Sequence, residues 1–281
     1  MTTSDAVRPA IVLFADLLGF SHQVQQARKP EDALKLTAKI KRFASNFSDS
    51  GANSDFYAKK YWAFSDSIVV AWYKGSEAEM EMTEFDANLF ELSGVAFAQA
   101  MTMYEDSQLV RGGIGAGWLM EDAEAVVGDA LVIAARLEKN VSTPFIAVES
   151  DLYDYYRSHR GRGNYHESID PIPELFIPPS EYTNHLPALD YLATAIGEID
   201  LTDADIYKAR SIPPGSARDA FHSERAYQNK LNFAIWHRDF VLQGRRSDDP
   251  RIKEKYDALG KHHNFRISQI FPNAPEALIT G

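Results

Sequence analysis

Two aspartates stand at places in the chain that suit metal binding. Asp16 ends the apolar run Ile11–Ala15 and precedes a glycine turn, while Asp66 lies in a short turn between two strand-like runs. A carboxylate binds Mg²⁺, and the clustered backbone N–H groups of a turn bind phosphate. Two such aspartates from neighbouring strands could hold a pair of metal ions on a triphosphate, although many strands end in aspartate for turn chemistry alone.

The elements that must position these aspartates are short strands and amphipathic helices. Residues 10–16 are predicted to form the first strand, and residues 57–64 and 68–73 a hairpin around Asp66. A helix is predicted over residues 31–47, because its apolar residues recur every three or four positions. Those apolar residues are Leu36, Ile40, Phe43 and Phe47.

Further along the chain, residues 110–120 are predicted to form a strand with glycines at 112, 113, 115 and 117. Glycine weakens a strand, so four of them indicate the close approach of another backbone or of a ligand. Helices are predicted over residues 85–104 and 128–140, with Asp129 as a cap, and a strand over 145–148. The order β-α-β-β-α-β-α-β predicts an α/β (α+β) sandwich, with helices packed on a mixed sheet.

The rest of the chain has a different pattern. Four prolines between residues 168 and 180 predict an irregular connection, and helices follow at 223–242 and 250–270. We therefore expect a core over residues 1–150 and a mostly helical extension over 151–281 that completes or covers the core or builds a dimer contact. Adjacent His262 and His263 do not face the same way on a helix, so they are predicted to lie on the surface.

Composition excludes several classes of function. The net charge of −11 argues against a general nucleic-acid surface, and the absence of cysteine excludes disulfides and zinc–thiolate sites. The first nine residues are polar, and no apolar run approaches the length that spans a membrane. The expectation is a soluble, cytoplasmic protein that binds neither nucleic acid nor membrane.

Four segments together resemble the catalytic domain of the class III nucleotidyl cyclases, over roughly the first half of the chain. They are FADLLGFS at 14–21, KYWAFSDS at 60–67, VRGGIGAG at 110–117 and GDALVIAARLE at 128–138. The resemblance implies two divalent ions, Mg²⁺ or Mn²⁺, and a role for each matching residue. The ions would be held by Asp16, Asp66 and the carbonyl of Leu17, and the phosphates by backbone N–H groups of Gly19, Phe20 and Ser21 and by Arg111, with Arg136 as a further catalytic residue.

The family's reaction is attack of the ribose 3′-oxygen on the α-phosphorus, with pyrophosphate leaving. Metal ions can acidify the 3′-hydroxyl and neutralise the leaving phosphates, and the guanidinium of Arg136 would stabilise charge on the α-phosphate. In the family one domain brings the aspartates and a second brings the helix arginine, so a homodimer with interfacial sites is implied. As an alternative to a catalytic role, Arg136 could be a surface helix residue paired with Glu138 or Asn140.

Three departures from the family pattern concern the base and the ribose. Trp62 stands where purine cyclases usually carry Lys or Glu, and Ala125 stands where a second base-reading residue is expected. An unpaired purine edge is costly, and Trp62 would narrow the pocket, with Tyr57 and Lys60 near enough to share in reading the base. The family's ribose-orienting Asn is replaced by Val132.

These departures resemble the pyrimidine cyclases of the bacterial Pycsar antiphage system. That resemblance implies conversion of UTP to cyclic UMP, a second messenger for a separate effector protein. Cyclic CMP from CTP, a purine cyclase and a catalytically silent nucleotide-binding domain stay open as alternatives.

Overall fold

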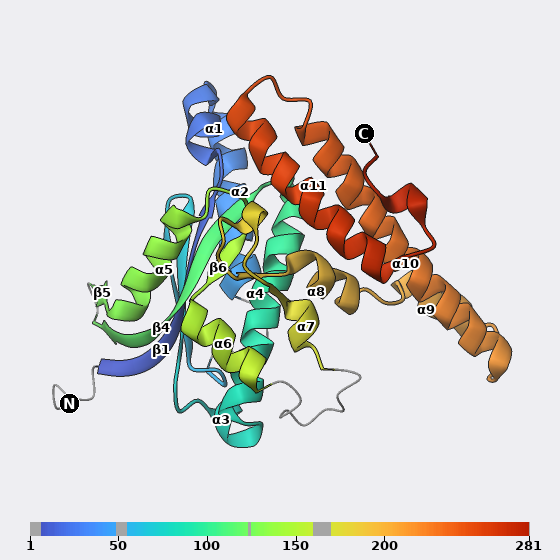
Figure 1. Cartoon of the computed structure of the whole chain (residues 1–281), viewed down its shortest axis with the longest axis horizontal. Coiled ribbons are helices and arrows are strands. Elements are labelled where there is room, and N and C mark those ends of the chain that lie inside the picture. Colours follow the sequence, from blue (N-terminus) through green and yellow to red (C-terminus); the bar gives the residue numbers. More distant parts are fainter. Residues whose placement is uncertain (1–6, 49–54, 123–124, 160–169, 281) are drawn as a thin grey trace. The chain divides into compact units, whose positions relative to one another are not determined.

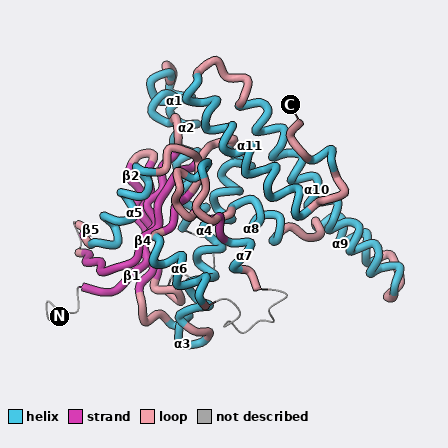
Figure 2. The backbone as a smooth tube through the Cα atoms, viewed as in Figure 1, coloured by secondary structure: helices cyan, strands magenta, loops and turns pink. Residues whose placement is uncertain are grey.

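The structure is a computed structural model that describes residues 7–48, 55–122, 125–159 and 170–280. The chain divides into two compact units, Met1–Tyr191 and Leu192–Gly281. The first unit contains a sheet whose strands lie side by side (Figure 2), with helices packed on it (Figure 1). Its elements are β1 Val7–Leu17, α1 Phe20–Gln26, α2 Pro30–Ser48, β2 Lys59–Phe64, β3 Ser67–Tyr73, α3 Glu77–Glu81, α4 Glu84–Asp106, β4 Val110–Glu121, β5 Val126–Val127, α5 Asp129–Asn140, β6 Ile146–Val148, α6 Ser150–Ser158, α7 Ile172–Leu175, β7 Phe176–Ile177 and β8 Ala188–Leu189.

The sheet has the strand order β2-β3-β1-β4-β6-β8-β7 within the described residues, and β5 pairs with β4. The pair β4–β6 is parallel, and the other pairs are antiparallel. The predicted fold class, helices packed on a mixed sheet, is confirmed. Strands β7 and β8 lie beyond residue 150, so the segment after that residue also contributes to the sheet of the first unit.

Strand alternation separates two hydrophobic layers on the two faces of the sheet. In β1, Leu13 and Leu17 face a core that contains Phe43 and Phe47 of α2 and apolar residues of α4. Val12 faces the opposite layer, which is covered by α5 (Figure 1). Because Asp16 is four residues after Val12, its side chain belongs to the α5 face. This face therefore carries the candidate site.

Two glycines of β4 explain how closely α5 approaches the sheet. A Cβ on Gly113 would lie 2.2 Å from the carbonyl oxygen of Ala134, and one on Gly115 would lie 2.6 Å from Cγ2 of Ile133. No side chain can be accommodated at such distances. The prediction that these glycines admit another backbone is therefore confirmed, and that backbone is the helix α5.

The predicted capping role of Asp129 is wrong. The residue that caps α5 is Gly128, and no side chain there accepts a bond from the first turn of the helix. The carboxylate of Asp129 instead accepts a hydrogen bond from the backbone N–H of Trp118, at 2.6 Å. Asp129 thus ties the start of α5 to the neighbouring strand β4, a cross-element contact that the local sequence does not reveal.

The second unit is helical. Its two long helices, α10 Ser216–Gly244 and α11 Pro250–Ile270, are the two that the sequence predicted, and α11 has the predicted bounds. Its N-terminus is capped by Asp249, whose carboxylate accepts a hydrogen bond from the N–H of Arg251 at 2.9 Å. None of the described helices is long and apolar enough to cross a membrane. The elements are α8 Tyr191–Glu198, which starts at the boundary between the units, α9 Asp203–Arg210, α10 Ser216–Gly244 and α11 Pro250–Ile270.

The predicted surface position of His262 and His263 is wrong. Both side chains are buried, with no exposed area. Nδ1 of His263 lies 2.9 Å from Nδ1 of His237 on α10, and Nε2 of His263 lies 2.7 Å from the carbonyl oxygen of Ala277. These contacts come from α10 and from the segment after α11, so spacing along α11 alone could not reveal them.

Candidate functional site

Asp16 lies at the end of β1, between the two strands that flank it. In the sheet register it stands opposite Ser67 of β3 and Arg111 of β4. The hydroxyl of Ser67 donates a hydrogen bond to Oδ1 of Asp16, at 3.0 Å. Side chains directly opposite each other in a sheet share a face, so the sheet itself brings the guanidinium of Arg111 to the same side as the Asp16 carboxylate.

Asp66 is held next to the end of β1 by the backbone. The N–H of Leu17 donates to the carbonyl oxygen of Asp66 at 3.0 Å, and Ser65 adopts the left-handed conformation, with φ at 57°. This turn brings Asp66 and Asp16 into one cluster, as the sequence predicted for neighbouring strand ends. Leu17 itself is buried, with 1% of its surface exposed.

The pKa of Asp16 is raised to about 6, chiefly because burial disfavours the charged carboxylate. The negative charges of Asp66 and Glu138 raise it further, while the hydrogen bond from Ser67 and the positive charge of Arg111 lower it. A divalent cation between the two aspartates would offset both the burial and the repulsion. The carboxylate is therefore poised to gain a positive partner.

Arg111 forms an ion pair with Glu138 of α5, a residue that the sequence suggests only as a surface partner of Arg136. Glu138 is on the buried face of α5, together with Ala130, Ala134 and Leu137. The available signal was the helical spacing of these residues, which places a carboxylate on an otherwise apolar face. Glu138 therefore joins Asp16, Asp66 and Arg111 in one cluster of charges.

The turn after β1 leads directly into the short helix α1. Gly19 has φ at 79°, a left-handed conformation that a glycine adopts without strain, and it precedes Phe20, the first residue of α1. The Phe20 side chain is buried in the core, while Ser21 is exposed. The three predicted phosphate-binding residues thus follow one another in one continuous turn.

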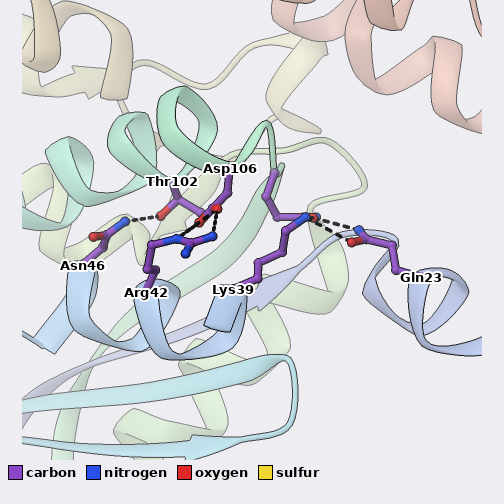
Figure 3. Close-up of polar contacts among 7 residues, drawn as sticks. Gln23, Lys39, Arg42, Asn46, Thr102 and Asp106 are labelled. Atoms are coloured by element: carbon purple, nitrogen blue, oxygen red, sulfur yellow. Dashed lines mark hydrogen bonds and ion pairs between the residues drawn. The ribbon is translucent and has the colours of Figure 1, made fainter. Parts of the chain in front are cut away.

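A polar network fixes this turn from behind. The amide of Gln108 donates to the carbonyl oxygen of Leu18 at 2.6 Å, and the Leu18 N–H donates to the carbonyl oxygen of Leu109 at 2.9 Å. The ammonium of Lys39 donates to the side-chain oxygens of Gln23, at 3.1 Å, and Gln108, at 3.2 Å (Figure 3). Residue spacing does not reveal this network, because its members come from three separate segments.

A second group of contacts in Figure 3 joins α2 to the end of α4. Arg42 forms a two-pronged ion pair with Asp106, and Asn46 donates to the hydroxyl of Thr102 at 3.2 Å. Together with the Lys39 network, these contacts hold α2 along the sheet near the turn. They position the site without touching its aspartates.

Arg136 does not join the cluster. It is exposed, and it lies on the face of α5 that also carries Val132, which is 64% exposed. Among the described residues no side-chain hydrogen bond or ion pair is found for Arg136, and Glu138, its suggested surface partner, pairs with Arg111 instead. Within one chain the structure thus separates Arg136 from the aspartates.

The three predicted base-pocket residues do not come together. Trp62 is half-buried on the α5 face, paired with Val69, and Lys60 lies two residues earlier on the same face, in an ion pair with Glu121. Tyr57 is buried under α4 instead, where its ring stacks on Phe90 with centroids 5.6 Å apart. The prediction that Tyr57 shares one pocket with Trp62 and Lys60 is therefore wrong.

The donor set at the strand ends fits Mg²⁺ or Mn²⁺ better than zinc. The described residues contain no group of three or more His, Cys, Asp or Glu side chains arranged to bind a metal. In the predicted site, Asp16 and Asp66 would supply two carboxylates, and Leu17 a carbonyl oxygen. Mg²⁺ is usually bound by one or two carboxylates, with water and substrate phosphates completing its shell.

Comparison with known proteins gives only distant likenesses. No protein family and no curated protein matches the chain. Among solved structures, the adenylyl cyclase CyaB from P. aeruginosa is 14% identical, with a TM-score of 0.42 over 54% of this chain and 82% of that one. An adenylate/guanylate cyclase/hydrolase from Silicibacter pomeroyi is 18% identical, with a TM-score of 0.40 over 65% of this chain and 94% of that one.

A third structure covers more of the chain. A class III adenylyl cyclase-like ATP-binding protein from Pseudomonas aeruginosa is 9% identical, with a TM-score of 0.42 over 92% of this chain and 72% of that one. At such identities and TM-scores, these likenesses assign neither a family nor an activity.

Proposed function

We propose that the protein is a nucleotidyl cyclase of the class III type, acting on a pyrimidine nucleoside triphosphate. The observation that carries the proposal is the meeting of Asp16, Asp66 and Arg111 at the ends of three strands, beside the Gly19 turn. Two carboxylates suit divalent ions, and a guanidinium and free backbone N–H groups suit phosphates. The four sequence segments that resemble the family all supply residues to this face or to the helix that covers it.

In this proposal each residue binds or orients part of the substrate. Asp16, Asp66 and the Leu17 carbonyl would hold Mg²⁺ or Mn²⁺, whose chemistry is to acidify the 3′-hydroxyl and neutralise phosphate charge. The turn at Gly19, Phe20 and Ser21 orients the β- and γ-phosphates. The guanidinium of Arg111 neutralises phosphate charge next to Asp16.

The base preference rests on Trp62 and Ala125. Trp62 is half-buried on the same sheet face as Asp16 and offers an aromatic surface, while Ala125 has no side-chain group to read a purine edge. We propose UTP as the substrate and cyclic UMP as the product, with CTP and cyclic CMP second. The product would act as a second messenger in defence against phage, through a separate effector protein.

The first test is a product assay. Purified protein is incubated separately with ATP, GTP, CTP and UTP in the presence of Mn²⁺, and products are identified by mass spectrometry. Cyclic UMP or CMP supports the proposal, while cyclic AMP or GMP contradicts the assigned base preference. No cyclic product from any nucleotide supports the catalytically silent alternative, to which the replacement of a ribose-orienting residue by Val132 also points.

The metal site is tested by two variants and a control. Asp16→Ala and Asp66→Asn are expected to lower product formation at least about a thousandfold, because each removes a metal ligand. Asp219→Asn removes an exposed carboxylate of α10 and should leave activity unchanged. Full activity of Asp16→Ala would contradict the catalytic role of this cluster.

The position of Arg136 calls for a second copy of the chain. Since Arg136 is exposed and apart from the aspartates, we propose a homodimer in which it acts on the partner's substrate. Mixing inactive Asp16→Asn with inactive Arg136→Ala should then restore about a quarter of wild-type activity, because half of the dimers carry one intact site of two. If the mixture stays inactive although the chains exchange, Arg136 does not act across the interface.

A further inference from the structure

We propose that Glu138 is a positioning residue that holds the Arg111 guanidinium in the nucleotide-free protein and releases it to an incoming polyphosphate. The inference rests on the proposed function, since it assigns a regulated anion contact to the same site. It makes Glu138 a competitor of the substrate phosphates for Arg111.

The contact that carries the inference is the ion pair across β4 and α5. An Nη2 atom of Arg111 bonds Oε1 of Glu138, with the Arg111 side chain 25% exposed and that of Glu138 only 7% exposed. The open side of the pair is therefore the arginine. An anion arriving from solvent meets the guanidinium first.

The arginine is incompletely satisfied in this arrangement. Its Nε atom is buried and has no hydrogen-bond partner within residues 7–48, 55–122, 125–159 and 170–280. A buried donor without a partner destabilises the arrangement that leaves it so. A guanidinium carries five N–H donors, so a polyphosphate with several acceptor oxygens can offer Arg111 more bonds than Glu138 alone.

Glu138 is placed for this role by the glycine of β4. A Cβ at Gly113 would lie 2.6 Å from Cβ of Leu137 and 2.8 Å from the backbone nitrogen of Glu138. The missing side chain lets this turn of α5 lie against β4, two residues from Arg111. Glu138 thus reaches the arginine from a rigid helix rather than from a loop.

The charges that surround the Arg111–Glu138 ion pair favour the replacement of Glu138 by another anion. Asp16, opposite Arg111 in the sheet, is influenced by both partners, since Glu138 raises its pKa and Arg111 lowers it. Two carboxylates, those of Asp16 and Glu138, thus interact with one guanidinium. Divalent ions at Asp16 and Asp66 would leave Glu138 as the remaining competitor of phosphate for Arg111.

The test measures binding of inorganic tripolyphosphate with Mg²⁺ by calorimetry, on the full chain. Glu138→Gln keeps the shape of the side chain and removes its charge, so it is expected to tighten binding about tenfold. Glu84→Gln is the matched control, because Glu84 pairs with Lys74 at 2.9 Å in a more exposed ion pair. The control variant should bind tripolyphosphate within about twofold of the wild type.

A double-mutant cycle separates competition for Arg111 from simple repulsion. In an Arg111→Gln background, Glu138→Gln should change tripolyphosphate binding no more than the Glu84→Gln control does. A persistent tenfold gain in that background would overturn the inference, because the effect would then be charge repulsion alone. Weaker binding by Glu138→Gln in the wild-type background would also overturn it, since Glu138 would then hold Arg111 in its binding position.

The readout is independent of turnover, so the two proposals can fail separately. If Glu138→Gln binds tripolyphosphate more tightly but the wild type makes no cyclic product, the proposed activity is wrong and the competition for Arg111 is supported. If the wild type makes a cyclic product but Glu138→Gln binds tripolyphosphate like the wild type, only the role inferred for Glu138 is wrong. Urea unfolding of each variant checks that the comparison is made between folded proteins.

Discussion

The Asp16 cluster of the first unit and the His237–His263 pair of the second unit both bury titratable side chains, but they satisfy them differently. Nε2 of His263 donates to the carbonyl oxygen of Ala277, which leaves its Nδ1 to accept from Nδ1 of His237 when both rings are neutral. In the Asp16 cluster, by contrast, Arg111 keeps a buried donor without a partner among the described residues. Satisfied groups rigidify a core, whereas unsatisfied charges at an open edge are suited to binding a ligand.

Burial also shifts the pKa of His263 and that of Asp16. The two shifts have opposite effects on the stability of the fold as the pH falls. The pKa of His263 is lowered to about 4, chiefly by burial, with the positive charges of Arg238 and Arg245 adding to the effect. The pKa of Asp16 is raised to about 6. As the pH falls from 7 to 5, the histidine therefore destabilises the fold, because its unfolded form binds the proton, while protonation of Asp16 favours the folded form.

The largest expected change in stability concerns a buried ion pair that lies outside the Asp16 cluster. On the opposite face of the same sheet, Lys59 and Glu91 form an ion pair at 2.7 Å, and each side chain is only 1% exposed. Lys59→Met should destabilise the protein by about 3–5 kcal/mol, because it leaves a buried carboxylate without its cation. The measurement is urea unfolding, and the double variant Lys59→Met/Glu91→Leu should recover most of the loss.

Glu138→Gln is the comparison for that pair, because Glu138 faces an arginine that is open to solvent. We expect its unfolding free energy to change by less than about 1 kcal/mol. Equal losses of unfolding free energy for Lys59→Met and Glu138→Gln would contradict the distinction between the buried Lys59–Glu91 pair and the partly exposed Arg111–Glu138 pair.

The second effect tests the close approach of α5 to β4. Gly113→Ala would place a methyl group 2.2 Å from the carbonyl oxygen of Ala134, so α5 must shift, at a cost of about 3 kcal/mol. Gly197→Ala is the control, because nothing lies within 4 Å of the added methyl group, and it should stabilise α8 by about 0.5–1 kcal/mol. Thermal and urea unfolding measure both changes, and wild-type stability of Gly113→Ala would contradict the tight packing.

The third effect concerns the histidine pair. The contribution of His263 to stability should fall by about 2 kcal/mol from pH 7.5 to pH 5, because the unfolded chain takes up a proton near pH 6.5 that folded His263 does not bind until about pH 4. His263→Gln should flatten this dependence in urea unfolding. His22→Gln, at an exposed position, should not change it, and an unchanged slope in His263→Gln would assign the dependence to other groups.

The smallest effect has the opposite sign. Asp16→Asn removes a carboxylate whose pKa of about 6 shows that burial opposes its charge, so at pH 7 the metal-free variant should be more stable. Because Asp16 is only partly buried, the gain should be about 1 kcal/mol. Urea unfolding in EDTA measures it, and a loss of stability would mean that the Asp16 charge supports the fold.

Local sequence patterns were sufficient for the long elements of the molecule. The strand β1, the helices α2, α4 and α11 and the glycine-rich strand β4 follow from apolar periodicity and from glycine spacing over ten or more residues. Shorter elements such as α3, β7 and β8 were missed, since two to five residues carry no period and are set by what they pack against.

The sequence predicts that Asp16, Asp66 and Arg111 stand at the ends of strands, because strand alternation and turn residues are encoded locally. Three contacts depend on how the chain packs: Arg111 bonds Glu138, Tyr57 lies under α4, and His263 is buried against His237. Each of these contacts joins segments that are distant along the chain. Which face of a helix or turn is buried depends on the element that covers it, and residue spacing carries no record of that partner.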